Sequence, residues 1–209
     1  MTTSTSTYRL NGYKKTPLLL VLAVVFTAFS QNVQSQTHFK IAPGSEVKVS
    51  GTSNLHDWTM LANEFSCAGS LLMKNGALVD ITSLKFVLPV INLKSNENLM
   101  DSRAHKALKA KVYPNITFVL TQASLMAKQK SINATGNLTI SGVTNKVDIQ
   151  AIYSLNADET VTIKGFRSVK MADYKIKAPS FMLGALKTGD ELVISFVLKL
   201  KTNELQSKN

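Results

Sequence analysis

The sequence is short of the residues on which several classes of protein depend. Only one cysteine occurs among 209 residues, so an internal disulfide framework and a cysteine-based zinc cluster are both excluded. Five prolines and ten glycines are too few for a collagen-like or low-complexity chain. Since 44% of the residues are apolar, the chain can bury a core, which excludes wholesale disorder.

Motifs that bind phosphates or activate a nucleophile are also missing. The chain has no Gly-x-Ser-x-Gly elbow, phosphate loop, dinucleotide fingerprint or His-Glu-x-x-His helix. His56 and His105 would form a zinc or copper site only if the fold brought them together with a carboxylate. Cys67 is expected to be a small core residue, since nothing near it in sequence would lower its pKa. We therefore expect neither catalysis nor a cofactor, and a His-based metal or redox protein is the less favoured alternative.

Acidic residues are scarce, with 13 against 24 basic residues and a net charge of +11. Long apolar runs are scarce as well, and the one from Leu18 to Phe29 follows a basic segment without acids. A run of this length is too short to cross a bilayer comfortably but suits the apolar core of a signal peptide. We predict a signal peptide at residues 1–36, cleaved after Ser30 or Ser35, and hence an exported protein.

A basic surface on an exported protein can face anionic lipid headgroups or simply water, and export makes nucleic acid the poorest partner. We therefore expect no nucleic acid, and contact with a membrane surface is a hypothesis. The densest cations, Lys106, Lys109 and Lys111, also fit an ordinary solvated helix face. A homodimer is a further hypothesis, because the sequence leaves the oligomeric state open.

Alternation of apolar and polar residues dominates the chain from Phe39 onward, most clearly over 147–153 and 192–200. Such alternation buries one face of each strand and predicts an antiparallel, all-β protein. No linker rich in Pro, Gly or Ser divides the region, so we predict one domain over 37–209. We expect about eight strands, with a ninth at the end, over 38–42, 46–51, 58–73 (broken at Gly69), 77–90, 115–126, 131–140, 146–155, 160–171 and 190–201.

Two segments break this alternation. From Glu97 to Lys111 the apolar residues follow helical spacing, and Asn98 is a candidate cap, which predicts one short amphipathic helix. The segment from Asp173 to Thr188 is unusually apolar for a connection. It is either a plug folded over one end of a barrel or a lid that contacts an apolar ligand. The pattern alone leaves both a sandwich and a barrel open.

Four blocks follow one another through most of the predicted mature chain: 49–58 (VSGTSNLHDW), 100–118 with Tyr113-Pro114 inside it, 136–144 (GNLTISGVT) and 170–179. Together they resemble the exported YceI-like family, which binds lipids or polyisoprenoids. The resemblance implies a lipocalin-like, antiparallel up-and-down β-barrel over 37–209. It also implies a long apolar cavity that holds a polyisoprenoid or another lipid.

From the resemblance and the apolar pattern we predict an exported, noncatalytic carrier or scavenger of one long apolar amphiphile. The periplasm is the favoured location, and secretion is the alternative. A filled barrel that binds a protein or an envelope surface is the alternative function. We place His56, Arg103 and His105 at the polar end of the cavity. The residues predicted to line it are Trp58, Phe86, Met100, Leu108, Phe118, Met171, Phe181, Met182 and Phe196.

Overall fold

The computed structural model describes residues 1–4, 35–181 and 185–202, and it divides the chain into two units, Met1–Val33 and Gln34–Asn209. Most of the predicted signal peptide lies outside the described residues, so that segment stays a prediction. The helices and strands of the second unit are β1 (Ser35–Ile41), β2 (Glu46–Ser53), β3 (Trp58–Ala62), β4 (Ser66–Lys74), β5 (Ala77–Pro89), η1 (Val90–Asn92), α2 (Asn98–Ala107), β6 (Asn115–Met126), η2 (Ala127–Gln129), β7 (Ser131–Ile140), β8 (Val143–Leu155), β9 (Thr160–Lys170), η3 (Met171–Tyr174), β10 (Ser180–Phe181) and β11 (Leu186–Thr202).

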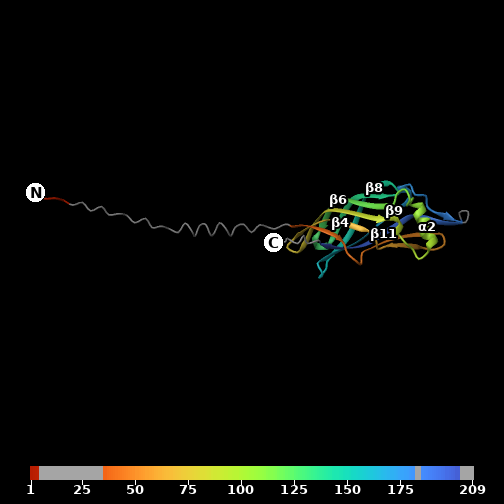
Figure 1. Cartoon of the computed structure of the whole chain (residues 1–209), viewed down its shortest axis with the longest axis horizontal. Coiled ribbons are helices and arrows are strands. Elements are labelled where there is room, and N and C mark those ends of the chain that lie inside the picture. Colours follow the sequence, from red (N-terminus) through yellow and green to blue (C-terminus); the bar gives the residue numbers. More distant parts are fainter. Residues whose placement is uncertain (5–34, 182–184, 203–209) are drawn as a thin grey trace. The chain divides into compact units, whose positions relative to one another are not determined.

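Eight of these strands close into an antiparallel ring. They follow the order β1, β4, β5, β6, β7, β8, β9 and β11, and β11 pairs back onto β1. Figure 1 shows the strands wrapping around a common axis, with α2 at one end. This confirms the predicted lipocalin-like antiparallel barrel with one helix. Within the described residues, no helix combines the length and the apolar character that crossing a membrane requires.

The remaining hairpin, β2 with β3, lies beside β11 and forms the barrel wall near α2. The first half of β11 pairs with β2, while its last residues pair with β1. Leu61 of β3 and Lys94 exchange two backbone hydrogen bonds, at 2.6 and 2.8 Å. The wall at this end is therefore completed by the hairpin and by the segment that follows η1.

Several predicted strand boundaries need correction. β1 begins at Ser35, three residues before the predicted strand, and the predicted strand 58–73 is in fact two strands. Its break lies at 63–65 instead of Gly69, because β3 pairs with β2 whereas β4 pairs with β1 and β5. β4 continues through Gly69, where the backbone of Ser83 lies too close for a side chain.

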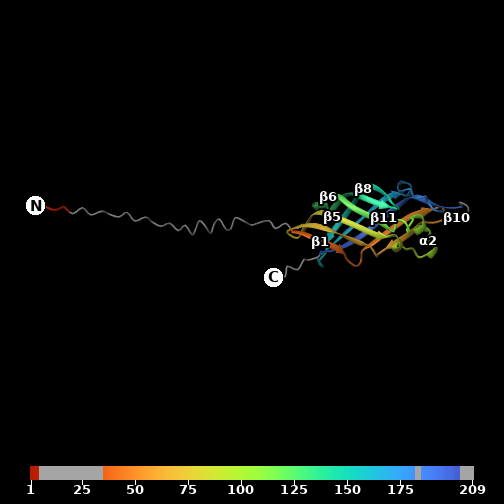
Figure 2. The same cartoon turned by 45° about the horizontal axis from the view of Figure 1, so that its top comes forward.

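The end of the barrel away from α2 is filled. We call it the packed end and define it by the buried cluster around Phe39, Leu71, Tyr153, Val161 and Leu200. Figure 2 shows α2 and β10 together at one end and β1 toward the other. None of the buried residues of this cluster is more than 8% exposed, so the packed end forms an ordinary buried core.

Cys67 belongs to the packed end and is 1% exposed. Burial raises the pKa of its thiol to about 12, which keeps it protonated and unreactive at neutral pH. The prediction that Cys67 is a core residue is confirmed.

Candidate ligand-binding cavity

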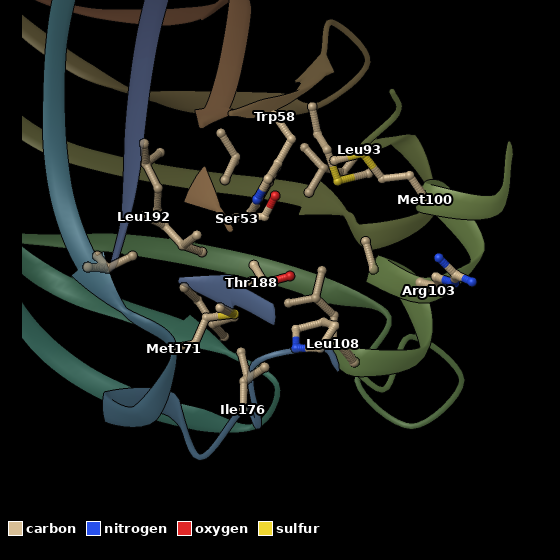
Figure 3. A pocket seen from close by; sticks show the side chains of 18 of the residues that line it. Ser53, Trp58, Leu93, Met100, Arg103, Leu108, Met171, Ile176, Thr188 and Leu192 are labelled. Carbon is tan, nitrogen blue, oxygen red and sulfur yellow. The ribbon is translucent and has the colours of Figure 1, made fainter. Parts of the chain in front are cut away.

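A cavity of about 340 Å³ lies beneath α2, and we call it the outer compartment. Its lining comes from both halves of the chain: the hairpin β2–β3, the segment after η1, α2, η3 and the start of β11. Figure 3 shows Trp58, Leu93 and Met100 on one side of this space and Met171 and Ile176 on the other. Side chains far apart in sequence therefore surround one apolar space.

A second cavity of about 140 Å³, the inner compartment, lies further from α2. Phe86, Phe118 and Phe196 are among its lining residues. The two compartments share four lining residues, namely Val49, Ile116, Ile140 and Ile194. They are consequently neighbours and form an apolar path that leads from α2 toward the packed end.

Two glycines make room for the aromatic side chains of this lining. A Cβ atom at Gly51 would overlap the indole ring of Trp58, and one at Gly136 would overlap the ring of Phe118. The Trp58 indole also donates a hydrogen bond from Nε1 to the Thr52 carbonyl oxygen at 3.1 Å. Since both rings lie directly against backbone, a side chain at either glycine would displace a wall of the cavity.

The helix α2 is held over the outer compartment by a buried carboxylate. Asp101, 6% exposed, accepts hydrogen bonds from Ser95 N at 2.6 Å and from Ser95 Oγ at 2.8 Å. Its other oxygen lies 3.7 Å from Lys94 Nζ. Burial acts to raise the pKa of Asp101, but the Ser95 hydrogen bonds, Lys94 and His105 outweigh it and hold this pKa below its usual value.

This arrangement corrects the predicted cap. The helix begins at Asn98, its cap residue is Glu97, and no side chain caps the first turn. Asn98 therefore does not cap the helix. The carboxylate of Asp101 instead binds the loop before the helix, because this loop turns back against the first helical turn.

The polar side chains of the outer compartment include His56, Glu97, Arg103 and Lys187. Arg103 lies on α2, on the side of the pocket away from Leu192 (Figure 3). The inner compartment is lined by apolar atoms. The cavity thus has a polar region near α2 and an apolar interior.

Most of the predicted site residues border one compartment or the other. Trp58, Met100, Leu108, Met171, His56 and Arg103 line the outer compartment, and Phe86, Phe118 and Phe196 line the inner one. The side chain of Phe181 and all of Met182 lie outside the described residues. Contact between any of these residues and a ligand stays a prediction.

His105 is placed differently from the other predicted polar residues. Its Nε2 donates a hydrogen bond to the Leu93 carbonyl oxygen at 2.9 Å, and it is not among the lining residues of the outer compartment. This bond fastens α2 to the segment after η1. His105 therefore stabilises the wall of the cavity without lining it.

The apolar segment 173–188 supplies part of the cavity wall. Tyr174 and Ile176 are 2% and 7% exposed and pack into a buried cluster with Val169 and Met171. Both also line the outer compartment, together with Pro179. In the described part of the segment these side chains cover one side of the cavity and leave its volume open.

Sequence reasoning missed several lining residues. Leu192 and Ile194 lie on the same strand as the predicted Phe196, four and two residues before it, so their side chains point to the same side of the sheet. This spacing could have identified them as lining residues. Ile140 also lies on an alternating strand. Leu93 follows a 3-10 turn and reaches the cavity only because Leu61 and Lys94 pair, which no local pattern signals.

No group of three or more His, Cys, Asp or Glu side chains suited to a metal ion occurs within residues 1–4, 35–181 and 185–202. His56 donates a hydrogen bond from Nδ1 to the Asp57 carbonyl oxygen at 2.8 Å, and His105 bonds to Leu93. Each ring is thus engaged locally with backbone, in separate segments.

An eight-stranded antiparallel ring with an apolar space under a single helix defines the class of hollow β-barrels whose interior has room for one small ligand. The family model of the YceI-like domain matches residues 28–200. The chain therefore belongs to the YceI-like family.

Solved structures share this fold at low sequence identity. Burkholderia cenocepacia BcnA is 20% identical, with a TM-score of 0.64 over 76% of this chain and 98% of that protein. A polyisoprenoid-binding domain from Saccharophagus degradans, implicated in plant cell wall breakdown, is 14% identical, with a TM-score of 0.64 over 81% and 100%. The Campylobacter jejuni YCEI protein is 17% identical, with a TM-score of 0.50 over 60% and 74%. The comparison with curated proteins found no match.

Proposed function

We propose that this protein is a noncatalytic carrier or scavenger that binds one long apolar amphiphile, a polyisoprenoid or another lipid, inside its barrel. The observation that carries the proposal is the apolar space beneath α2, with its outer and inner compartments. Membership of the YceI-like family and the fold shared with a polyisoprenoid-binding domain support it. No motif for catalysis competes with this function in the sequence.

The size of the cavity limits the length of chain that can be enclosed. An apolar cavity of about 150 Å³ holds one benzene molecule, which has six carbons. By that scale the outer compartment of about 340 Å³ and the inner one of about 140 Å³ hold on the order of 20 carbons together. A longer chain would extend out of the barrel beside α2.

The lining favours one orientation of the ligand. Burying a polar group without a hydrogen-bond partner costs roughly 2–7 kcal/mol, so a headgroup is disfavoured in the inner compartment. His56, Glu97, Arg103 and Lys187 offer polar partners in the outer compartment. The apolar tail therefore enters toward the packed end, and the headgroup stays near α2.

Chain length rather than charge should dominate the affinity. Burial of each methylene contributes about 0.8 kcal/mol, so one five-carbon isoprene unit contributes about 4 kcal/mol before the ordering cost of binding. An exposed ion pair adds at most about 1 kcal/mol. The affinity should rise with each isoprene unit and stop rising once the cavity is full.

Two measurements test this function. Organic extraction of protein purified from its native host, followed by mass spectrometry, should release a lipid with a long apolar chain. Titration of lipid-free protein with isoprenoid alcohols of increasing length should show affinity that rises and then levels off near 20 carbons. Failure to recover a lipid, together with no binding of added isoprenoids, would remove the proposal.

A matched pair of variants locates the binding site. Ala104 lines the outer compartment, so Ala104→Phe fills space that the ligand needs. Ala68 is an exposed residue of β4, so Ala68→Phe adds the same ring outside the barrel. Loss of isoprenoid binding in Ala104→Phe, with binding retained in Ala68→Phe, is the expected result, and equal binding by both would place the ligand elsewhere.

The proposed carrier is exported, which rests on the pattern of residues 1–36, and the periplasm is favoured over secretion through the family resemblance alone. Fractionation of native cells should recover a shortened chain outside the cytoplasm. Amino-terminal sequencing of that chain distinguishes cleavage after Ser30 from cleavage after Ser35. A full-length chain confined to the cytoplasm would refute the export.

A further inference from the structure

The outer side of α2 and the turn that follows it form a basic surface, residues 102–112, which we call the helix surface. It contains Lys106, Lys109 and Lys111, all exposed, and no acidic residue occurs from 102 to 112. The acid that precedes it, Asp101, is buried and already bonded to Ser95 and Lys94. The positive charge of these lysines is therefore not neutralised within their own segment.

Apolar side chains flank the same surface. Leu99 at the start of α2 is 61% exposed, and Val112 after its end is 68% exposed. Leu55, in the loop between β2 and β3, is 67% exposed and lies at the edge of the outer compartment. One exposed leucine needs no explanation, but here exposed apolar residues and lysines occur together beside a cavity.

The lysines of the packed end have a different setting. Lys199 there pairs with Asp158, with 2.8 Å between Nζ and Oδ2. Lys40 of β1 lies opposite Lys201 of β11, and the apolar residues just before them along the strands, Phe39 and Leu200, are buried. The helix surface thus differs from the packed end in combining exposed lysines with exposed apolar side chains.

We propose that the helix surface docks on an anionic phospholipid bilayer. Lys106, Lys109 and Lys111 contact the phosphate headgroups, while Leu99 and Val112 enter the interface, as in other basic surfaces that bind membranes. The mouth of the outer compartment then faces the bilayer, so a long apolar molecule passes between membrane and barrel without crossing bulk water. This goes beyond ligand binding, which the cavity alone can perform.

Vesicle sedimentation tests the docking directly. The full protein is mixed with vesicles of phosphatidylcholine, either pure or with about 30% phosphatidylglycerol. We expect binding to the anionic vesicles only, lost at about 1 M salt, where charges are screened within about 3 Å. Equal binding to both kinds of vesicle, or no binding to either, would overturn the proposal.

Charge variants locate the surface. The triple variant Lys106→Gln, Lys109→Gln, Lys111→Gln should bind anionic vesicles about 100-fold more weakly, since each lysine near a membrane contributes about fivefold. The control variant Lys40→Gln, Lys74→Gln, Lys201→Gln removes the same charge from exposed lysines of other strands and should bind nearly as the wild type. Equal losses in both variants would show a general charge effect and refute docking through α2.

Two further measurements separate docking from ligand binding. The variant Leu99→Ser, Val112→Ser keeps the charge and should also weaken vesicle binding, because the apolar contacts are lost. The triple lysine variant should keep its affinity for an isoprenoid alcohol in vesicle-free solution, since none of the three lysines lines the cavity. Loss of isoprenoid binding in that variant would contradict the division between surface and cavity.

Discussion

The packed end of the barrel and the end beneath α2, which we call the hollow end, share the long strands β9 and β11, yet only the packed end is filled. Along β11, Leu200 is buried in the packed end, whereas Leu192 and Ile194 line the outer compartment. The alternation is the same in both halves. The difference therefore arises from the partners that the strand meets and not from its own pattern.

Those partners differ in two respects. At the packed end β11 pairs with β1, and Phe39 of β1 enters the buried cluster. At the hollow end β11 pairs with β2, and the cover is α2, whose inward side chains include Ala104 and Ala107. Small side chains under a helix leave volume that larger ones would occupy, so a cavity remains.

The largest expected difference between the two ends concerns truncation of large side chains. Leu71→Ala at the packed end, where Leu71 is 0% exposed, should lower the free energy of unfolding by about 3–4 kcal/mol. Ile194→Ala at the hollow end should cost less, about 2 kcal/mol, because Ile194 is only half-buried and already borders empty space. Urea unfolding measures both values. Equal losses would mean that the hollow end is packed in solution.

Enlargement of a side chain should also cost more stability at the packed end than beneath α2. Val161→Phe inserts a ring where Val161 is 1% exposed, which should cost about 2 kcal/mol. Ala104→Phe places the same ring in the outer compartment and should change stability by less than about 1 kcal/mol. Thermal or urea unfolding of the two variants checks this, and a greater loss for Ala104→Phe would contradict an open cavity.

The buried carboxylate of Asp101 should contribute less to the free energy of unfolding than a large core side chain, but more than an exposed ion pair. Asp101→Asn weakens two charged hydrogen bonds from Ser95 and should lower the free energy of unfolding by about 1.5 kcal/mol at neutral pH. Because the pKa of Asp101 is lowered in the folded protein, this stabilisation is complete above its unfolded pKa of about 3.9 and is lost as the pH falls further.

The pH dependence gives this prediction its control. The wild type and Asp101→Asn should differ in stability at pH 6 and converge as the pH falls below about 3.9. Urea unfolding at each pH measures the difference. A difference that stays constant down to the lowest pH would exclude ionisation of Asp101 as its source.

The smallest effect is expected from the exposed pair at the packed end. The Lys199 and Thr160 hydrogen bonds hold the pKa of Asp158 at about 2. Since this carboxylate is open to solvent, salt screens the pair, and Asp158→Asn should change stability far less than Asp101→Asn. Carboxyl titration by NMR checks the pKa, and an ordinary value would show that the pair does not persist in solution.

Local periodicity made much of the fold predictable. Apolar residues alternate with polar ones over β8 and β11 and follow helical spacing over α2. These patterns identified the elements, because the apolar residues repeat with the period of the side that faces the core. Phe86, Phe118 and Phe196, which we predicted to line the cavity, border the inner compartment, and their contact with a ligand stays a prediction. The family resemblance, rather than periodicity, selected a barrel over a sandwich.

Long-range pairing made the rest unpredictable. The break between β3 and β4 falls at 63–65 because the two strands have different partners, and no residue in that break signals it. His105 bonds to Leu93, twelve residues earlier, and so supports the cavity wall from behind. Both outcomes depend on which segments become neighbours after folding.

The sequence by itself determined which side of each strand is apolar, where the helix lies and the excess of positive charge, because these follow from the order of residues along the chain. Only the tertiary structure decided that one end is filled and the other hollow. A cavity is the difference between the volume that the wall encloses and the volume of the side chains inside it. That difference exists only once the wall has closed.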